Sequence, residues 1–247
     1  MGSVGPTPLL EIRQPAQGYR FSIDSVLLAG FAAPFCRGAV VDLGTGCGVL
    51  LLLLARLAPG MTSGTGVELQ RELLSFAREN FRRSGLQDRL RALEGDLREA
   101  VAGAPGGAFD LVISNPPYGR AGHGRRNPDP GKEAARHEVS CTLPELFAAA
   151  RRLMAPGGRF ALILPVGRLP EIEACARREG IGGGLVRRVH PRSGAPPRRV
   201  LYCGNAGESG SPGELPPLFL HGTEEKYAPE VERICRLFRA GRQDRGA

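Results

Sequence analysis

The stretch AVVDLGTGCG at residues 39–48 decides the fold that we expect for this chain of 247 residues. Residues 39–43 predict a short buried strand, and the apolar run after the glycines predicts a helix to about Ala58. A glycine-rich turn between a strand and a helix is typical of a nucleotide-type site, because glycine lets the backbone approach a ligand closely and the helix N-terminus attracts negative charge. Residues 44–48 are therefore expected to bind a ligand.

Strand-like and helix-like segments alternate through the rest of the chain. Strands are expected at residues 63–68, 90–94, 109–114, 159–164, 185–190 and 199–204. Helices are expected at residues 24–33, 70–84, 142–155, 168–179 and 229–240. This alternation predicts a single, doubly wound α/β domain with a mostly parallel sheet of seven strands. We divide the chain into an N-terminal segment, the domain proper, and a C-terminal helix with its tail, at residues 1–38, 39–221 and 222–247.

A second informative stretch is DLVISNPPY at residues 110–118. Its apolar run reads as a buried strand that the two prolines must end, because proline lacks an N–H and fixes φ at about −65°. Asn115 and Tyr118 therefore project from a stiff turn at the carboxyl end of a strand. In open α/β sheets ligands bind at this edge, so the turn is a candidate active-site element.

The spacing of the glycines distinguishes two classes of ligand. A dinucleotide-binding loop requires Gly-x-Gly-x-x-Gly, whereas this loop is Gly-x-Gly-x-Gly preceded by Asp42. It resembles the S-adenosylmethionine (SAM) loop of class I methyltransferases, which implies a Rossmann-like fold with SAM as the cofactor. By that resemblance, Glu68 would accept hydrogen bonds from the ribose hydroxyls, and Asp96 would accept one from the adenine amine.

The cofactor residues that we expect follow strand ends or lie on the helix near residue 24, which the resemblance implies covers the methionine end of SAM. They are Ser25, Asp42, Gly44, Thr45, Gly46, Gly48, Glu68, Asp96, Leu97 and Asn115.

The Asn-Pro-Pro-Tyr turn suits methylation of an amine on a planar ring. An exocyclic amine such as adenine N6 is a poor nucleophile, because its lone pair is delocalised into the ring. Two acceptors that take both N–H bonds would draw the nitrogen toward a tetrahedral geometry, and the Asn115 side-chain oxygen and the Pro116 carbonyl provide such a pair. Tyr118 would stack on the ring. The expected catalytic residues are Asn115, Pro116, Pro117 and Tyr118, and no general base is required.

Asn-Pro-Pro-Tyr on this scaffold resembles the amino-methyltransferases that act on adenine N6, guanine N2 or glutamine N5. Further segments narrow the resemblance to the bacterial valine-tRNA adenine N6-methyltransferase family, over roughly residues 9–221. These segments lie at residues 14–28, 135–138, 189–191 and 198–201. The resemblance implies a tRNA substrate, with the adenine beside the anticodon as the target.

Three alternatives stay open. A protein-glutamine N5-methyltransferase would resemble a chain with a helical N-terminal domain, and only about 38 residues precede the first expected strand. A ribosomal-RNA guanine N2-methyltransferase often has a duplicated domain or Phe in place of Tyr118. A non-catalytic SAM-fold subunit that binds RNA usually loses the acceptor motif or the glycine loop, and both are present here.

The charge of the chain favours an RNA partner. The net charge is +8 and arginine supplies nearly all of the 33 basic residues, although a GC-rich genome would produce the same excess of arginine. Basic loops beside the pocket would hold phosphates and position a base extruded from its stack. The expected RNA-binding residues fall in two segments, after the Asn-Pro-Pro-Tyr turn and near the end of the domain: Arg120, Arg125, Arg126, Arg136, Arg187, Arg188, Arg192, Arg198 and Arg199.

Other classes of site are disfavoured. The six cysteines are scattered without a Cys/His cluster, so we expect no metal site and reduced thiols in a cytoplasmic protein. No basic and apolar N-terminal signal is seen, and the apolar run at residues 49–54 is far shorter than the ~20 residues of a membrane span. We expect no membrane association and no obligate protein partner.

Overall fold

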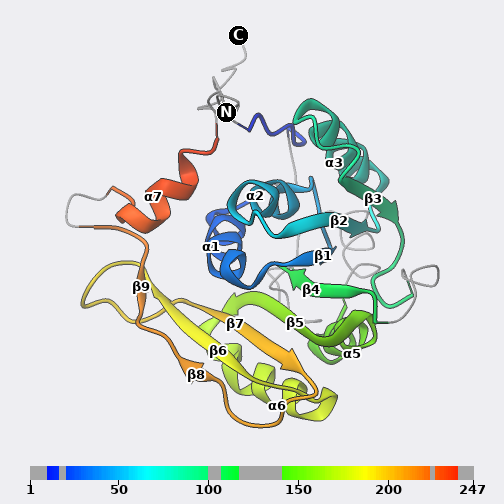
Figure 1. The fold of residues 1–247 in the computed structure, drawn as a ribbon. Coiled ribbons are helices and arrows are strands. Elements are labelled where there is room, and N and C mark those ends of the chain that lie inside the picture. Colours follow the sequence, from blue (N-terminus) through cyan, green and yellow to red (C-terminus); the bar gives the residue numbers. More distant parts are fainter. Residues whose placement is uncertain (1–9, 17–20, 100–106, 117–140, 223–225, 239–247) are drawn as a thin grey trace, which may run out of the picture.

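A computed structural model describes residues 10–16, 21–99, 107–116, 141–222 and 226–238, and these residues form one mixed sheet of nine strands with helices on both faces (Figure 1). Along the sheet the strands follow the order β3-β2-β1-β4-β5-β7-β6-β8, and β9 also pairs with β6. The strands are β1 Gly38–Leu43, β2 Met61–Glu68, β3 Leu90–Glu94, β4 Phe109–Ser114, β5 Met154–Pro165, β6 Ile181–His190, β7 Arg199–Ala206, β8 Gly213–Glu214 and β9 Leu218–Phe219.

The strand directions bring several loops to one edge of the sheet. Strands β1 to β5 are parallel, and β7 runs antiparallel to both β5 and β6. One edge of the sheet therefore carries the carboxyl ends of β1, β2, β4, β5 and β6. The first residue of β7, Arg199, lies at the same edge, where it pairs with Pro165. This catalytic edge, as we name it, is where ligands bind in open α/β sheets.

Two hydrophobic cores lie on opposite faces of the sheet. The helices α1, α2, α3 and α7 contribute to one core, and α5 and α6 to the other, as their placement in Figure 1 also shows. These helices are α1 Ile23–Ala32, α2 Val49–Leu57, α3 Arg71–Arg83, α5 Leu143–Leu153, α6 Leu169–Glu179 and α7 Pro229–Cys235, with short 3₁₀ turns at Ala33–Phe35 and Val166–Arg168. In α2 the six residues from 49 to 54 are all buried, as expected of a helix with no polar face.

The doubly wound, mostly parallel architecture is confirmed, with corrections of detail. Two strands exceed the seven expected, and both are two-residue edge segments (β8 and β9), too short to show an alternating pattern. Strand β5 begins at Met154, within the helix expected over residues 142–155, and includes Pro156 to Gly158, which were expected to separate that helix from the next strand. The pairing of β4 with β5 has an irregularity there, and Gly157 has a φ of 70°. Helix α7 ends at Cys235 rather than near residue 240.

The segments near the two ends of the described chain pack together on the α1 face. The Leu10 N–H donates to the Leu237 carbonyl at 2.7 Å, and the Phe21 ring stacks on Phe238 with 5.4 Å between centroids. Among the described residues, no helix is long and apolar enough to cross a membrane.

Candidate active site

The glycine loop turns sharply because three of its residues have positive φ. The φ angles of Gly44, Gly46 and Gly48 are 78°, 55° and 80°, a region that side chains other than glycine rarely adopt. The N–H groups of Gly44 and Thr45 both donate to the Val67 carbonyl at 2.9 Å, which fixes the loop on β2. A Cβ at Gly44 would meet nothing within 4 Å, so the loop faces open space there.

Asp42, at the end of β1, is a fully buried acid beside this loop. Its Oδ2 accepts from the Thr45 hydroxyl at 2.7 Å, while its buried Oδ1 has no hydrogen-bond partner within the described part of the chain. Burial, with a smaller contribution from the nearby Glu68 carboxylate, raises the pKa of Asp42 to about 7. A buried carboxyl oxygen without a donor is costly, so the site suits a ligand that brings a cation or a donor.

Glu68 ends β2 and connects that strand to the loop. Its Oε2 accepts from the Gly46 N–H and its Oε1 from the Gln70 N–H, both at 2.9 Å, and the residue is 6% exposed. A carboxylate has about four lone-pair positions, so each oxygen can accept one more hydrogen bond from a ligand.

The turn after β4 lies beside the glycine loop. Asp42 and Ile113 are partners in the β1–β4 register, and the Ser114 hydroxyl donates to the Leu43 carbonyl at 2.7 Å. Gly44 and Asn115, the next residues of the two strands, therefore leave the sheet side by side. The structure thus joins the two motifs that the sequence singled out.

The side chain of Asn115 is oriented by α1. Its Nδ2 donates to the Ser25 hydroxyl at 3.1 Å, and Ser25, in the first turn of α1, is 3% exposed. The other polar atom of this amide is the Asn115 side-chain oxygen, Oδ1. Pro116 is half-buried in the same turn, whereas Pro117 and Tyr118 lie outside the described residues.

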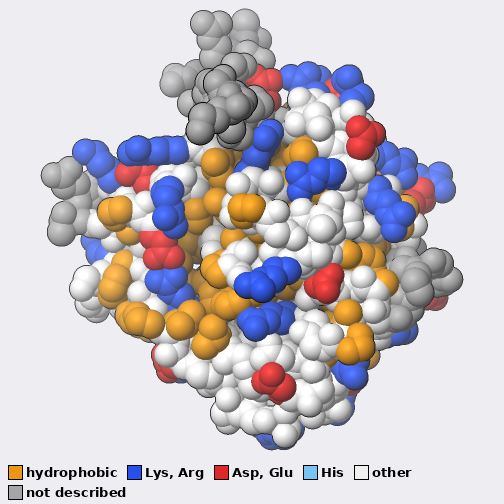
Figure 2. Space-filling view, in the orientation of Figure 1, with side chains coloured by type: hydrophobic (Ala, Val, Ile, Leu, Met, Phe, Trp, Pro, Cys, Tyr) orange, Lys and Arg blue, Asp and Glu red, His pale blue; other side chains and the backbone are white. Residues whose placement is uncertain are grey.

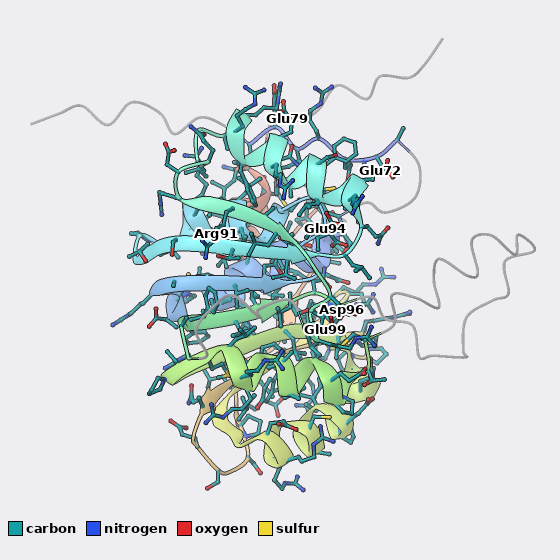
Figure 3. All side chains as sticks on the ribbon, turned by 90° about the vertical axis from the view of Figure 1, so that its right-hand side faces the viewer. Glu72, Glu79, Arg91, Glu94, Asp96 and Glu99 are labelled. Carbon is teal, nitrogen blue, oxygen red and sulfur yellow. The ribbon has the colours of Figure 1, made fainter. Side chains whose placement is uncertain are left out.

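Asp96 is already engaged by a neighbouring residue. Its Oδ1 accepts from the Arg98 N–H and from Arg98 Nε, both at 2.9 Å, and this contact with Arg98 lowers the pKa of Asp96. Figure 3 shows Asp96 beyond the end of β3, and Arg98 reaches Glu145 of α5 at 3.7 Å. Leu97 is half-buried and packs against the α5 side of the molecule.

The arginines expected to bind RNA divide into three groups. Arg187 donates to Glu230 at 2.6 Å and 3.0 Å, Arg188 pairs with Glu214, and Arg199 Nε donates to Asp24 Oδ2 at 3.1 Å. By contrast, two arginines on the loop between β6 and β7 are exposed at the catalytic edge: Arg192 and Arg198. Four more lie outside the described residues: Arg120, Arg125, Arg126 and Arg136. On the face in Figure 2, basic and acidic side chains are interspersed rather than gathered into one patch.

One residue with a supporting role was missed by the sequence analysis. Asn80 is fully buried in α3, and its Nδ2 donates to the Cys47 carbonyl at 2.9 Å and to the Arg13 carbonyl at 2.8 Å. It therefore joins the glycine loop to the N-terminal segment. The available signal was an asparagine on the apolar face of that helix, one residue before Phe81.

No group of three or more His, Cys, Asp or Glu residues that could hold a metal ion occurs in the described ranges.

Comparisons with known proteins indicate the family of this chain. The family model for the methyltransferase small domain matches residues 23–166.

Two relatives with the same name are similar over most of the chain. A tRNA1(Val) (adenine(37)-N6)-methyltransferase of Tolumonas auensis is 32% identical over 229 residues, 92% of each chain. Its namesake in Aeromonas salmonicida is 34% identical over 178 residues, 72% of this chain and 73% of the relative. Among solved structures, a predicted O-methyltransferase, Atu636, from Agrobacterium tumefaciens has a TM-score of 0.70 at 25% identity, covering 87% of this chain and 96% of its own.

Proposed function

We propose that this chain, which belongs to the methyltransferase small domain family, transfers a methyl group from SAM to the N6 amine of an adenine in tRNA. The observation that carries the proposal is the position of Asn115 beside the glycine loop, on neighbouring strand ends, with its amide nitrogen bonded to Ser25. An amine acceptor and a nucleotide-type loop then serve one site.

The residues around the loop fit SAM. Asp42 brings a buried carboxyl oxygen without a donor, which suits a ligand with a positive charge, and Glu68 can accept from two ribose hydroxyls. The loop residues Gly44 and Gly46 let the backbone approach closely, and Gly48, Thr45, Asp96, Leu97 and Ser25 complete the proposed cofactor site. When bound, SAM supplies a methyl group already activated on a sulfonium, so the protein contributes position rather than acid–base chemistry.

The turn after β4 holds the substrate amine. The Asn115 oxygen and the Pro116 carbonyl accept its two N–H bonds, while Ser25 holds the Asn115 nitrogen away from the amine. The sequence motif leads us to propose that Pro117 limits the conformations of this turn and that Tyr118 stacks on the base, although both lie outside the described residues. Two acceptors in fixed positions favour the pyramidal nitrogen of the transition state over the planar nitrogen of the free base, which is how binding energy lowers a barrier.

Two observations favour tRNA as the substrate. The relatives that span most of the chain are named tRNA1(Val) (adenine(37)-N6)-methyltransferases. In addition, Arg192 and Arg198 are exposed on the β6–β7 loop at the catalytic edge, where they can contact phosphates around an extruded base. A cytoplasmic location fits such a substrate.

Methyl transfer by the purified protein tests this function. The protein is incubated with methyl-labelled SAM and either a valine tRNA transcript with adenine beside the anticodon, the same transcript with guanine there, or ribosomal RNA. Digestion and mass spectrometry then identify the modified nucleoside. We expect N6-methyladenosine from the first transcript alone. N2-methylguanosine in ribosomal RNA would replace this function with the guanine alternative, and no transfer to any RNA would contradict it.

A further inference from the structure

Arg199 occupies a different position from the exposed arginines next to it. It is the first residue of β7 and pairs with Pro165, at the catalytic edge. Its neighbour Arg198 is exposed, whereas the Arg199 side chain is 32% exposed and turns toward α1. Two arginines adjacent in the sequence therefore face different surroundings.

Arg199 forms an ion pair with Asp24, a buried carboxylate of α1. Arg199 Nε donates to Asp24 Oδ2 at 3.1 Å, and the Asp24 side chain is only 7% exposed. Asp24 lies in the first turn of α1, and its N–H is capped by the Ser22 hydroxyl at 3.3 Å. The helix N-terminus favours a negative charge there, and removing one partner of a buried ion pair destabilises a protein strongly. Arg199 thus fixes the beginning of α1 against the sheet.

The next residue of that turn reaches the proposed catalytic asparagine. Ser25, directly after Asp24, accepts from Asn115 Nδ2 at 3.1 Å. A continuous path therefore runs from β7 through the first turn of α1 to the end of β4. A shift of this turn would move the group that orients the Asn115 amide.

We propose that Arg199 is a positioning residue of the active site, acting through Asp24 and Ser25 on Asn115, and not a contact to RNA phosphate. This inference rests on the proposed function, in which Asn115 accepts hydrogen bonds from the substrate amine. Errors of about 1 Å in such a group can cost about a hundredfold in rate. Loss of Arg199 therefore lowers the rate of methyl transfer within the bound complex, while the protein keeps its phosphate contacts.

The comparison of Arg199→Gln with Arg198→Gln separates the two roles. For each variant, the single-turnover rate is measured at saturating SAM and tRNA, and tRNA affinity is measured over a series of salt concentrations. We expect Arg199→Gln to lower the rate by about tenfold or more, with the wild-type dependence of affinity on salt. Arg198→Gln is expected to weaken tRNA binding and to reduce the salt slope by about one. A reduced slope with a full rate in Arg199→Gln would overturn the inference.

A double-mutant cycle tests the path through Asp24. If Arg199 acts on the site through Asp24, then Asp24→Asn combined with Arg199→Gln slows transfer no more than the stronger single variant. Independent effects that multiply would contradict this path.

Should Arg199→Gln not fold, Arg199→Lys serves instead, because lysine also binds phosphate. Our inference predicts a slower rate for that variant, whereas a phosphate contact predicts the wild-type rate and slope. A wild-type protein inactive on every RNA would refute the proposed function itself, before these variants are compared.

Discussion

At the scale of single residues, Asp42 is a carboxyl group with no exposed surface. Burial raises its pKa to about 7, from an ordinary value of 3.8. Between these values the folded protein holds a proton that the unfolded chain has released. The free energy of unfolding therefore falls as pH rises through this window, by up to about 1.4 kcal/mol per pH unit. We predict this fall for the ligand-free protein in urea unfolding at pH 4.5 to 7.5.

The control for this prediction is Asp42→Asn, which keeps a polar group beside Thr45 but cannot titrate. Carboxyls whose pKa is lowered, such as Asp96 beside Arg98, titrate below the window and leave the comparison unaffected. A wild-type protein and an Asp42→Asn variant with parallel pH profiles would show that Asp42 is ionised throughout.

Some ion pairs of single residues could not be predicted from the sequence. Residues 180–207 contain five arginines and no acid, which favoured a free basic surface. In the fold, Arg187 and Arg188 pair with Glu230 and Glu214, which come from later segments. Arg199 pairs with Asp24, 175 residues away. Composition within a window cannot reveal partners that only the fold brings together.

At the scale of elements, the strands and helices with strong periodicity were predicted within a few residues, because their signals are local. The glycine loop was also predictable, since its φ angles demand glycine. The two-residue strands β8 and β9 were not, because their pairing with β6 depends on the path of the whole C-terminal region. The resemblance assigned Ser25 and Asn115 to one site. Only the fold shows the hydrogen bond between them.

A glycine pair tests how the loop is packed against α3. Gly48 and Gly85 have similar φ angles of 80° and 65°, but a Cβ at Gly48 would lie 2.5 Å from Phe81 Cε1, and one at Gly85 would meet nothing within 4 Å. We predict that Gly48→Ala costs about 1–3 kcal/mol more than Gly85→Ala in urea unfolding. Equal costs would mean that backbone strain alone determines both, and that the loop does not pack on Phe81.

At the scale of the whole molecule, the two ends of the described chain share a hydrophobic core with α1, the helix that carries Ser25 of the proposed site. Leu10 of segment 10–16 bonds to Leu237 of segment 226–238, and Phe238 of the latter segment stacks on Phe21, which lies just before the first turn of α1. The proposed divisions at residues 38 and 221 therefore mark parts that share one core. This arrangement could not be predicted from the sequence, which indicated only a helix near each end of the chain.

Ile234 tests this packing. It is 4% exposed in α7, and a Cβ at Gly30 of α1 would lie 2.3 Å from its Cδ1, so the two helices are in close contact. We predict that Ile234→Ala lowers the free energy of unfolding by about 2–5 kcal/mol. The matched control, Glu232→Ala on the exposed side of α7, removes a surface ion pair with Arg236 and should cost less than about 1 kcal/mol. A similar small loss for both variants would show that α7 contributes little to the fold.

The central claim is that this protein methylates adenine N6 in tRNA with Asn115 as an acceptor for the amine. It is tested most directly by mass spectrometry of tRNA from a strain that lacks the gene, complemented with wild-type protein or Asn115→Ala. We predict that deletion removes N6-methyladenosine from a tRNA and that the wild-type protein restores it. Asn115→Ala should restore less than about 1% of it while binding SAM within about twofold of the wild-type affinity, because the lost contact acts mainly in the transition state. Full restoration by Asn115→Ala, or unchanged tRNA after deletion, would contradict the claim.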